Sequence, residues 1–279
     1  MNISKIAALA QVSPATVSRY INNGYVSNEK KERIRAVIEK TGYTPMASAQ
    51  TLRTKRNHLI GVIVPKISSE SVSRMVDGIT EALFGTNYQI ILANTDNTIE
   101  KEINFLQIFS HNTVDGVIFI ATAIGRRHRE ILKTYHKPLV VLSQQEKGRP
   151  SVFFDDYGAA YAAAEHLVKQ GCSSLACLCV MQADKAAGKA RLEGFCDAAK
   201  KHGAQVDKRL ICSVDFSVAD GEAGIKKLLK TKLPFDGLFC ATDNIAYGAV
   251  KALAKAGVAV PEAVKVCAVG DNKMSALFT

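Results

Sequence analysis

The sequence lacks the patterns that mark membrane, secreted and metal-binding proteins. No apolar run approaches membrane-spanning length, and the amino-terminal MNISKIAALAQVS has no charged-then-hydrophobic signal pattern. The seven cysteines include one close pair, Cys177 and Cys179, but no second pair at metal-ligand spacing. We therefore expect a soluble cytoplasmic protein whose cysteines are buried thiols, with no metal site and no cofactor.

Signatures of catalysis are also missing. The segment VIVPKISSES contains neither G-x-G-x-x-G nor G-x-x-x-x-G-K-[ST], and the six histidines are scattered without a Ser/His/Asp set. Asp155 and Asp156 are adjacent carboxylates, but neighbouring side chains on a strand point to opposite faces. We predict no catalytic residues, and an α/β enzyme is the alternative from another functional class.

Positive charge is concentrated at one end of the chain. Residues 1–58 contain ten Lys or Arg and three acidic residues, a net +7, whereas the other 221 residues carry the remaining +3 of the total +10. Lys and Arg displace condensed counterions from phosphates, so this basic head favours a polyanionic partner. Ordinary solvated helix faces are the alternative interpretation of the same charges.

Within this head, caps and apolar spacing predict three short helices. Asn2 can cap a first helix, Ser13 followed by Pro14 begins a second, and a third begins after Ser27 and ends at Gly42. The apolar residues expected to face inward are Ile3, Ile6, Leu9, Ala10, Val17, Ile21, Ile34, Val37 and Ile38. Three helices joined by tight turns form a helix-turn-helix domain, which we assign to residues 1–44.

The second helix is the candidate for contact with DNA bases, because the amino-terminal residues of such a helix reach base edges in the major groove. Arg19 has the fork that matches two guanine acceptors, Thr16 can hydrogen-bond, and the methyl of Ala15 can meet a thymine methyl. Ser18 and Asn22 suit phosphate. The candidates in the head are Ser13, Pro14, Ala15, Thr16, Ser18, Arg19 and Asn22. Exposed polar positions on a stable three-helix unit are the alternative.

Residues 45–58 predict a linker with a marginal helix. Ala49 and Leu52 share a face of MASAQTLRT at i and i+3, but so short a helix does not offset its own nucleation cost. A segment that folds on contact with DNA fits this composition. Leu52 would then be an apolar wedge in the minor groove, with Arg53 and Lys55 on phosphate. A plain linker is the equal alternative.

From Leu59 onward, apolar runs of strand length alternate with helix-length segments. One series is LIGVIVP, QIILANT, GVIFIAT and PLVVLS, and the second is SLACLCV, LICSVD, GLFCAT and KVCAVG. Continuous apolar strands alternating with helices indicate parallel sheets covered on both faces. We predict an α/β core over residues 59–279, with two doubly wound subdomains, 59–144 and 152–279, joined through SQQEKGRPSVFFDDYG.

An ordered set of motifs runs through the chain, comprising ISKIAALAQVSPATVSRYINN, VSNEKKERIRAVIEKTGYTPMASAQTLRTKRNHLIGVIVP, EHLVKQG, ARLEGF, FCATDNIAYGA and VCAVGDN. With these motifs the chain closely resembles the LacI/GalR family of bacterial transcriptional regulators over essentially its whole length. Within the family, QQEKGRPSVFFDDYGA and VGDNKMS are most similar to the branch of sucrose and trehalose operon repressors.

The resemblance implies a helix-turn-helix head, a periplasmic-binding-protein-like core and a homodimer whose paired heads bind a near-palindromic operator. Pro14, Ala15 and Arg19 fall where the family reads bases, and Leu52 falls where it wedges the minor groove. Pro14 and Ala15 offer no side-chain hydrogen bonds, so the operator sequence stays open. An effector between the subdomains would lower DNA affinity by the difference in its binding to two states, typically about 1–3 kcal/mol.

Polar residues follow the strands of both series, where open parallel sheets bind ligands. An aromatic ring beside several hydrogen-bonding groups suits a sugar. The effector-site candidates are Lys66, Ser69, Gln144, Arg191, Phe216, Asp243 and Asn272. By resemblance, Arg191, Asp243 and Asn272 bind sugar hydroxyls. Phe216 matches the stacking aromatic, and Lys66 matches a basic residue for a phosphorylated sugar. Helix capping is the alternative role of Ser69 and Asp243.

The chain stops at VGDNKMSALFT, where the resemblance leads us to expect several tens of further residues. Their absence would leave an exposed sheet edge. We predict a repressor of a sucrose or other disaccharide operon, released from its operator by a sugar or sugar phosphate. The alternatives are a truncated regulator with an impaired effector response and a member whose ligand is a co-repressor. A sugar-transport protein would have no use for the basic head.

Overall fold

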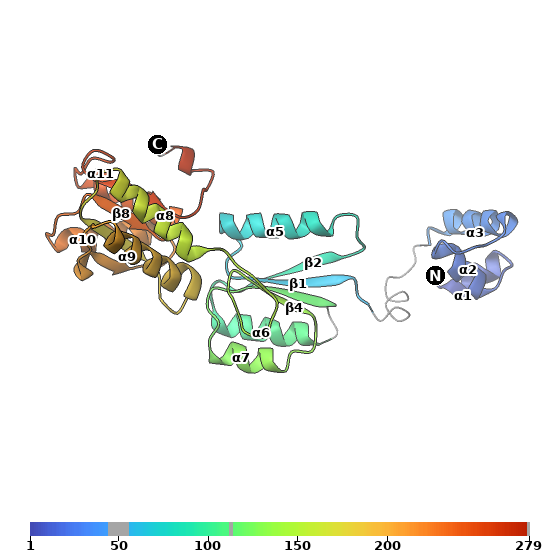
Figure 1. Ribbon diagram of the computed structural model, residues 1–279. Coiled ribbons are helices and arrows are strands. Elements are labelled where there is room, and N and C mark those ends of the chain that lie inside the picture. The colour runs from blue at the N-terminus through green and yellow to red at the C-terminus, as the bar shows by residue number, and fades with distance from the viewer. Residues whose placement is uncertain (44–55, 112–113, 278–279) are drawn as a thin grey trace. The chain divides into compact units, whose positions relative to one another are not determined.

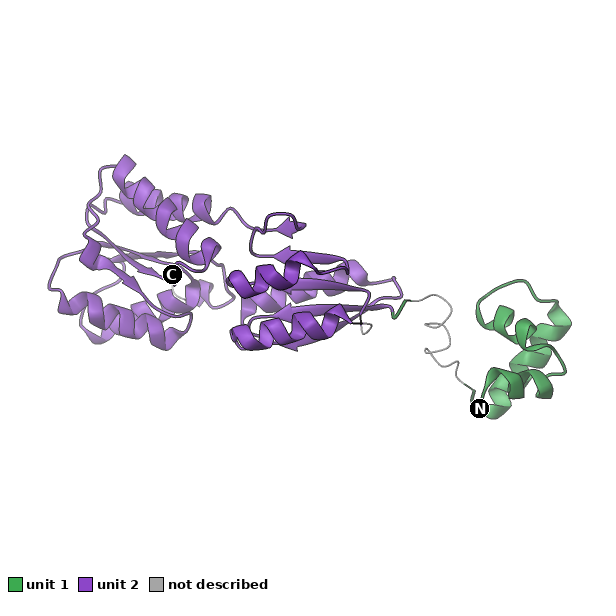
Figure 2. Ribbon diagram, turned by 90° about the horizontal axis from the view of Figure 1, so that it is seen from below, with its two compact units in different colours: residues 1–57 green, residues 58–279 purple. Residues whose placement is uncertain are grey.

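The computed structural model describes residues 1–43, 56–111 and 114–277. The chain divides into two compact units, residues 1–57 and 58–279 (Figure 2). Each unit has hydrophobic clusters of its own. Within the described ranges, no helix combines the length and the apolar character needed to cross a membrane.

The first unit contains the three predicted helices, α1 (Ile3–Leu9), α2 (Pro14–Ile21) and α3 (Asn28–Thr41). The Asn2 side chain accepts a hydrogen bond from the backbone N–H of Lys5. Gly42 ends α3 in the left-handed conformation, with φ 61°, which a residue without Cβ adopts at no steric cost. The helix-turn-helix prediction is therefore confirmed.

The core of this unit differs from the expected one at a single position. Ile6, Val17 and Ile34 are completely buried, as predicted. Leu9, however, is 58% exposed, and this expectation was wrong. Ala7 is buried instead, and Ala10 is buried as expected, because the inward face of α1 is centred on Ile6, Ala7 and Ala10 and turns Leu9 outward.

The second unit begins with a five-stranded parallel sheet in the order β2-β1-β3-β4-β5. Its strands are β1 (Leu59–Val64), β2 (Gln89–Asn94), β3 (Gly116–Ile120), β4 (Leu139–Leu142) and β5 (Ser151–Val152). The helix α5 (Glu70–Leu83) lies on one side of this sheet, and α6 (Ile99–Ser110) and α7 (Arg126–Lys133) lie on the other (Figure 1). We call residues 58–152 the first lobe.

Side chains of β1 alternate between these two layers. Val62 and Val64 pack in the cluster that includes Val72 of α5, whereas Ile63 packs with Leu106 of α6. The expectation that every strand is covered on both faces was wrong for the two edge strands of this sheet, since Leu92 of β2 is 39% exposed and Val152 of β5 is 59% exposed. An edge strand has only one neighbouring strand, so the covering helices overlap it less.

The second lobe, residues 156–277, contains a four-stranded parallel sheet in the order β7-β6-β8-β9. Its strands are β6 (Leu175–Cys179), β7 (Ile211–Ser213), β8 (Gly237–Cys240) and β9 (Lys265–Ala268). Its α-helices are α8 (Asp156–Lys169), α9 (Arg191–Lys201), α10 (Val218–Lys230) and α11 (Asp243–Lys255). A π-helix, Lys185–Ala190, precedes α9, and short 3-10 helices span Lys208–Leu210 and Ser275–Leu277. The predicted α/β class with parallel sheets is confirmed.

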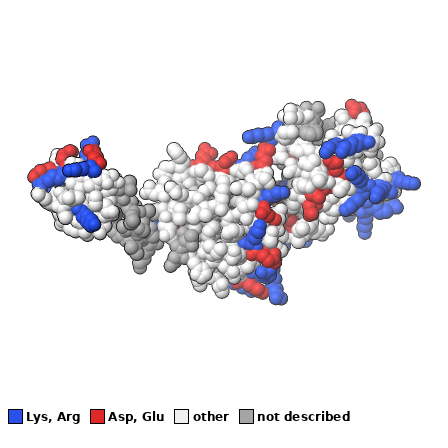
Figure 3. Space-filling model, turned by 180° about the vertical axis from the view of Figure 1, so that it is seen from behind, with Lys and Arg blue, Asp and Glu red and all other residues white. Residues whose placement is uncertain are grey.

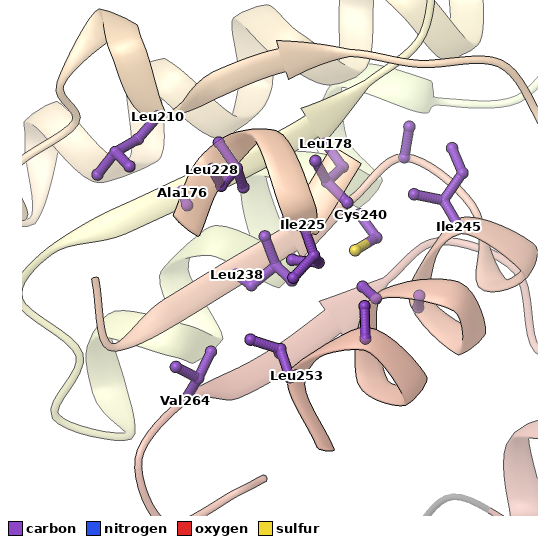
Figure 4. Close-up of a cluster of buried hydrophobic side chains, with 14 of the residues drawn as sticks. Ala176, Leu178, Leu210, Ile225, Leu228, Leu238, Cys240, Ile245, Leu253 and Val264 are labelled. Atoms are coloured by element: carbon purple, nitrogen blue, oxygen red, sulfur yellow. The ribbon is translucent and has the colours of Figure 1, made fainter. Parts of the chain in front are cut away.

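The strand β6 supplies both cores of this lobe. Leu178 packs with Ile225 of α10 and Leu253 of α11 (Figure 4). On the opposite face, Cys177 and Cys179 both pack with helices α8 and α9, because side chains two positions apart on a strand point to the same side. All seven cysteines lie in this lobe, and all are free.

The helices α10 and α11 approach each other closely through two glycines. A Cβ on Gly248 would clash with the carbonyl oxygen of Val218, and a Cβ on Gly221 would clash with that of Ile245. These are backbone atoms of the opposite helix, which have no rotamer freedom to move aside. The close approach therefore depends on the absence of a side chain at both positions.

The crossover between the lobes corrects one interpretation of the sequence. Asp155 and Asp156 lie at the start of α8 and not on a strand. The strand β5 ends at Val152, and Asp155 caps the helix by accepting a hydrogen bond from the N–H of Gly158 at 2.8 Å. The first N–H groups of a helix have no partner within the helix, so a carboxylate there can accept hydrogen bonds from them. A longer strand would not provide such donors to Asp155.

Candidate nucleic-acid interface and effector site

The first turn of α2 is capped by the Ser13 side chain. The Ser13 hydroxyl accepts a hydrogen bond from the Thr16 N–H at 3.2 Å and shares a second with the Thr16 hydroxyl at 2.9 Å. Pro14 and Ala15 follow on the exposed surface, as does Ser13 itself. The structure therefore presents the first turn of α2 outward, with the Thr16 hydroxyl already engaged by the cap.

The end of α2 carries the remaining candidates. Arg19 is exposed, whereas Ser18 and Asn22 are partly buried. The Asn22 amide donates to the Ser18 carbonyl at 2.6 Å, which fixes its orientation. In the described part of the head, the ion pairs are Arg33 with Glu29 and Arg35 with Glu39, and Arg19 belongs to neither.

Charge on the head is distributed over several helices. On the face drawn in Figure 3 the head shows separate basic side chains, with acidic ones near some of them. The two pairs in α3 lower the free positive charge of that helix, since each arginine is matched by a glutamate one turn away. Arg19 therefore keeps a charge that an external anion or base can use.

Three predicted DNA contacts, Ala49, Leu52 and Arg53, lie outside the described residues, as does Lys55. One exposed residue was missed by sequence reasoning. Tyr25, in the turn between α2 and α3, is 89% exposed. The feature that could have indicated it in the sequence is a single aromatic residue directly after Gly24 in a polar turn. The hydroxyl of an exposed tyrosine can contact a sugar–phosphate backbone.

In the second lobe, the Arg191 side chain is held by Asp156 and by the Ala241 carbonyl at the carboxyl end of the sheet. Its Nε and Nη2 donate to Oδ1 of Asp156, at 2.8 and 2.7 Å, and its Nη1 donates to the carbonyl of Ala241 just after β8. The side chains of Arg191 and Asp156 are 14% and 5% exposed. An effector that hydrogen-bonds Arg191 therefore meets a guanidinium whose position is already fixed.

Asp243 and Asn272 are brought together at the same end of this sheet. The Asn272 N–H donates to Oδ2 of Asp243 at 2.7 Å. Asp243 is the first residue of α11 and not its N-cap, which is Thr242, so the capping alternative is wrong for this side chain. Phe216 is partly buried against the cluster that contains Ala241 and Ile245.

In the first lobe, Lys66 and Ser69 follow β1, and Gln144 follows β4. Lys66 is exposed, and Asp96 nearby is paired with Lys101 at 3.1 Å. Ser69 occupies the N-cap position of α5, but its hydroxyl accepts no hydrogen bond from a backbone N–H of the helix and lies 3.0 Å from the hydroxyl of Ser71. Gln144 is 4% exposed.

Three contacts join the lobes near these candidates. The Gln144 amide donates to Oδ1 of Asp184 at 2.8 Å. The loop that carries Asn272 touches the first turns of α5, because Glu70 accepts from the Lys273 N–H at 3.0 Å and Arg74 donates to the Asp271 carbonyl at 3.1 Å. The lobes therefore meet along the edge where the candidates of both sheets lie.

Asp184 is a site residue that sequence reasoning missed. It is 3% exposed and caps the π-helix, accepting from the N–H groups of Ala186 and Ala187 at 3.0 Å each. Burial raises its pKa above the ordinary value, and the hydrogen bonds from Gln144 and the backbone oppose this rise. An aspartate ahead of the helical stretch KAAGKARLEGF was the available signal.

Comparison with known proteins decides the family. Residues 2–46 match the family described as bacterial regulatory proteins, lacI family. Residues 57–277 match the family described as periplasmic binding proteins and sugar binding domain of LacI family. This chain belongs to the LacI family.

Several LacI-family relatives are similar over most of the chain. The sucrose operon repressor of Staphylococcus xylosus is 31% identical over 88% of this chain and 76% of its own length. The transcriptional regulator RegA of Clostridium acetobutylicum is 34% identical over 99% of this chain and 84% of its own. Among solved structures, the complex of the transcriptional regulator CelR with cellobiose is 26% identical, with TM-score 0.69, and the match covers 95% of this chain and 81% of that one.

The LacI family consists of transcription regulators and not of enzymes. In the described ranges no group of three or more His, Cys, Asp and Glu side chains is placed to hold a metal ion. What the LacI-type core brings together is a set of hydrogen-bonding side chains on two sheets, with the inter-lobe contacts beside them. Such an arrangement binds and orients a polar ligand.

Proposed function

We propose that this LacI-family chain is a transcriptional repressor that binds operator DNA through α2 and releases it when a sugar or sugar phosphate binds between the lobes. The observation that carries the proposal is the union, in one chain, of an exposed Arg19 on a capped recognition helix with a two-sheet core that gathers polar side chains. A repressor of this kind acts on chromosomal DNA in the cytoplasm.

The DNA-binding role is supported by the geometry of the head. Pro14, Ala15 and Arg19 are exposed on the part of α2 that reaches base edges in a helix-turn-helix complex. We assign bidentate guanine contact to Arg19, apolar contact to Ala15, and phosphate contact to Ser13, Ser18 and Asn22. We propose that residues 1–44 bind the major groove and that the linker 45–58, with Ala49, Leu52 and Arg53, contacts the minor groove.

The effector role is supported by the polar edge of the core and by the relatives. The relatives include a sucrose operon repressor and a regulator solved with cellobiose, so we propose a disaccharide or its phosphate as the effector class. Arg191, Asp243 and Asn272 would hydrogen-bond its hydroxyls, and Phe216 would stack on a ring face. Lys66 would pair with a phosphate on the ligand.

The proposed mechanism is linkage between the two sites. Two copies of the chain would form a homodimer and bind the two halves of a near-palindromic operator. A ligand that contacts both lobes favours one relative orientation of the lobes. If that orientation separates the linkers, residues 45–58, of the two copies, operator affinity falls. The fall equals the difference in ligand binding free energy between the two states, typically about 1–3 kcal/mol.

The DNA-binding part is tested by selecting sequences from a random duplex library with the full chain and measuring their affinity. Arg19→Ala should weaken the selected site by about 1–3 kcal/mol and relax its preference at one base position. Arg33→Ala is the matched control, because it removes the same charge from an arginine already paired with Glu29. Equal losses for both variants would leave only nonspecific electrostatic binding and would contradict the proposal.

The effector part is tested by titrating the DNA complex with sucrose, cellobiose and their phosphates. An inducer should lower operator affinity, whereas a rise in affinity would instead identify a co-repressor. Lys66→Ala should weaken the response to the phosphorylated ligand and leave the free sugar unchanged. Asn272→Ala should weaken both. A response that neither substitution alters would exclude this edge of the core as the effector site.

A further inference from the structure

A groove beside the crossover between the two lobes lies apart from the effector-site candidates. It encloses about 630 Å³ and is lined by residues of both lobes, among them Arg129, Lys147, Arg149, Phe153 and Lys185. None of the seven effector-site candidates belongs to its lining. A volume of this size falls in the range of small-molecule sites, about 300–1,000 Å³. We call this cavity the flank groove.

The flank groove is strongly basic. Four of its lining side chains are Lys or Arg, and the one carboxylate is Glu146, which pairs with Arg129 at 3.1 Å. Among the ion pairs of the described residues, the groove contributes only this one, so Lys147 and Lys185 have no carboxylate partner. Unpaired ammonium groups facing one cavity from two lobes attract an anion.

The loop from Glu146 to Ser151, which carries Lys147 and Arg149, is held in place by several hydrogen bonds. The Ser151 hydroxyl accepts from the Glu146 N–H at 3.1 Å and donates to the Arg149 carbonyl at 3.0 Å. The Arg149 guanidinium donates to the carbonyls of Leu132 and Tyr135. The turn is therefore ordered before any ligand arrives, which lowers the entropic cost of binding.

An aromatic ring stands beside the cations. Phe153 lines the flank groove and is 50% exposed, and its neighbours Val152 and Phe154 are 59% and 60% exposed. Of these three exposed apolar residues only Phe153 belongs to the lining, and its half-exposed ring offers a surface for a ligand ring. Phosphate on the lysines and a ring on Phe153 form one composite site.

The flank groove also adjoins the contact between the lobes. Its residues Gln145 and Lys185 are the chain neighbours of Gln144 and Asp184, which share the 2.8 Å hydrogen bond. An anion bound by Lys147 of the first lobe and Lys185 of the second would add a charged link beside that bond. Binding here therefore favours the lobe orientation in which the two lysines converge.

From this geometry we propose that the flank groove is a second ligand site, which binds an organic phosphate with an aromatic ring, such as a nucleoside monophosphate. The phosphate lies between Lys147 and Lys185, and the ring lies on Phe153. This site is distinct from the edge of the core that carries the effector-site candidates, so the proposal does not depend on the identity of the sugar.

The test is calorimetric titration of the full chain at constant ionic strength with adenosine monophosphate, ribose 5-phosphate, adenosine and inorganic phosphate. Adenosine monophosphate should bind most tightly. Lys147→Gln and Lys185→Gln should each weaken it about 5- to 20-fold, as expected for one charge-assisted contact. Phe153→Ala should weaken adenosine monophosphate and leave ribose 5-phosphate unchanged, because only the former has a ring to stack.

Two controls separate this site from other basic surfaces. Lys226→Gln removes an exposed lysine of α10, outside the groove, and should leave binding unchanged. Lys230→Gln, at a second exposed lysine of the same helix, should also leave it unchanged, and a loss in either variant would mean nonspecific attraction to basic surface. The proposal is overturned if adenosine monophosphate does not bind, if both groove lysines can be replaced without effect, or if inorganic phosphate binds as tightly, which would mean an adventitious ion only.

Discussion

Arg191 and Asp156 form a buried ion pair, with Nη2 and Oδ1 2.7 Å apart, that ties the start of α9 to the start of α8. Removing one partner leaves the other charge buried without compensation. We expect Asp156→Ala to lower the free energy of unfolding by about 3–5 kcal/mol in urea denaturation. Glu130→Ala, which breaks an exposed pair with Arg126 at 3.1 Å, should cost less than about 1 kcal/mol. Similar losses would mean that burial of the first pair has no energetic effect.

The raised pKa of Asp184 predicts a pH dependence of stability. Its folded form holds a proton to higher pH than the unfolded chain does, because burial disfavours the charge. Its contribution to stability is therefore full below the ordinary aspartate pKa and is lost as the pH rises through the folded pKa. The stability of the wild type relative to Asp184→Asn should increase as the pH is lowered towards about 4.

Asp207 provides the control for that experiment. Its pKa is lowered to about 2 by hydrogen bonds from Arg209, so the sign is opposite. Its contribution is present above the ordinary value and is lost as the pH falls through the folded pKa. The stability of the wild type relative to Asp207→Asn should therefore decrease on acidification, and parallel slopes for the two variants would contradict the assignment for Asp184.

Two glycines in helices should respond to alanine in opposite directions. Gly248→Ala places a methyl against the Val218 carbonyl and should destabilise the chain by about 1–3 kcal/mol or more. Gly78 lies within α5, and a Cβ there meets nothing within 4 Å. Gly78→Ala should stabilise by about 0.5–1 kcal/mol through helix propensity. Thermal denaturation of both variants checks the pair, and a stabilising Gly248→Ala would refute the close approach of α10 and α11.

Tyr135 carries a hydroxyl that is buried without a hydrogen-bond partner among the described residues. Burial raises its pKa to about 12. Tyr135→Phe should leave stability unchanged or raise it by up to about 1 kcal/mol, because no bond is lost. Tyr157→Phe removes a 2.9 Å bond to Asp197 and should not be stabilising. A clear loss in Tyr135→Phe would show that its hydroxyl has a partner, such as water.

Local signals in the sequence were sufficient for most of the fold. Ser13 ahead of Pro14 predicted the start of α2, because a capping side chain acts within one helical turn. The apolar runs predicted both sheets, because strands buried on both faces need continuous apolar residues. The crossover was interpreted less well, because Asp155 and Asp156 were assigned to a strand, whereas β5 stops at Val152 and both residues lie at the start of α8.

The site could be predicted only in part. The positions after the strands were found because parallel strands bring their carboxyl ends to one edge. The partners of those residues could not be found, since Arg191 meets Asp156 across 35 positions and Gln144 meets Asp184 across 40. The first pairing depends on how α8 and α9 pack and the second on how the two lobes meet, and no spacing pattern in a single sequence encodes either.

The confinement of all seven free cysteines to the second lobe gives the molecule a built-in reporter. A thiol reagent added to the folded protein would label half-buried Cys196, Cys212 and Cys267 before the buried Cys177 and Cys240. The head and the first lobe would not react with the reagent, since neither contains a cysteine. The labelling rate of the buried pair would thus measure opening of one half of the core alone, and its slowing by a ligand would localise protection without any engineered probe.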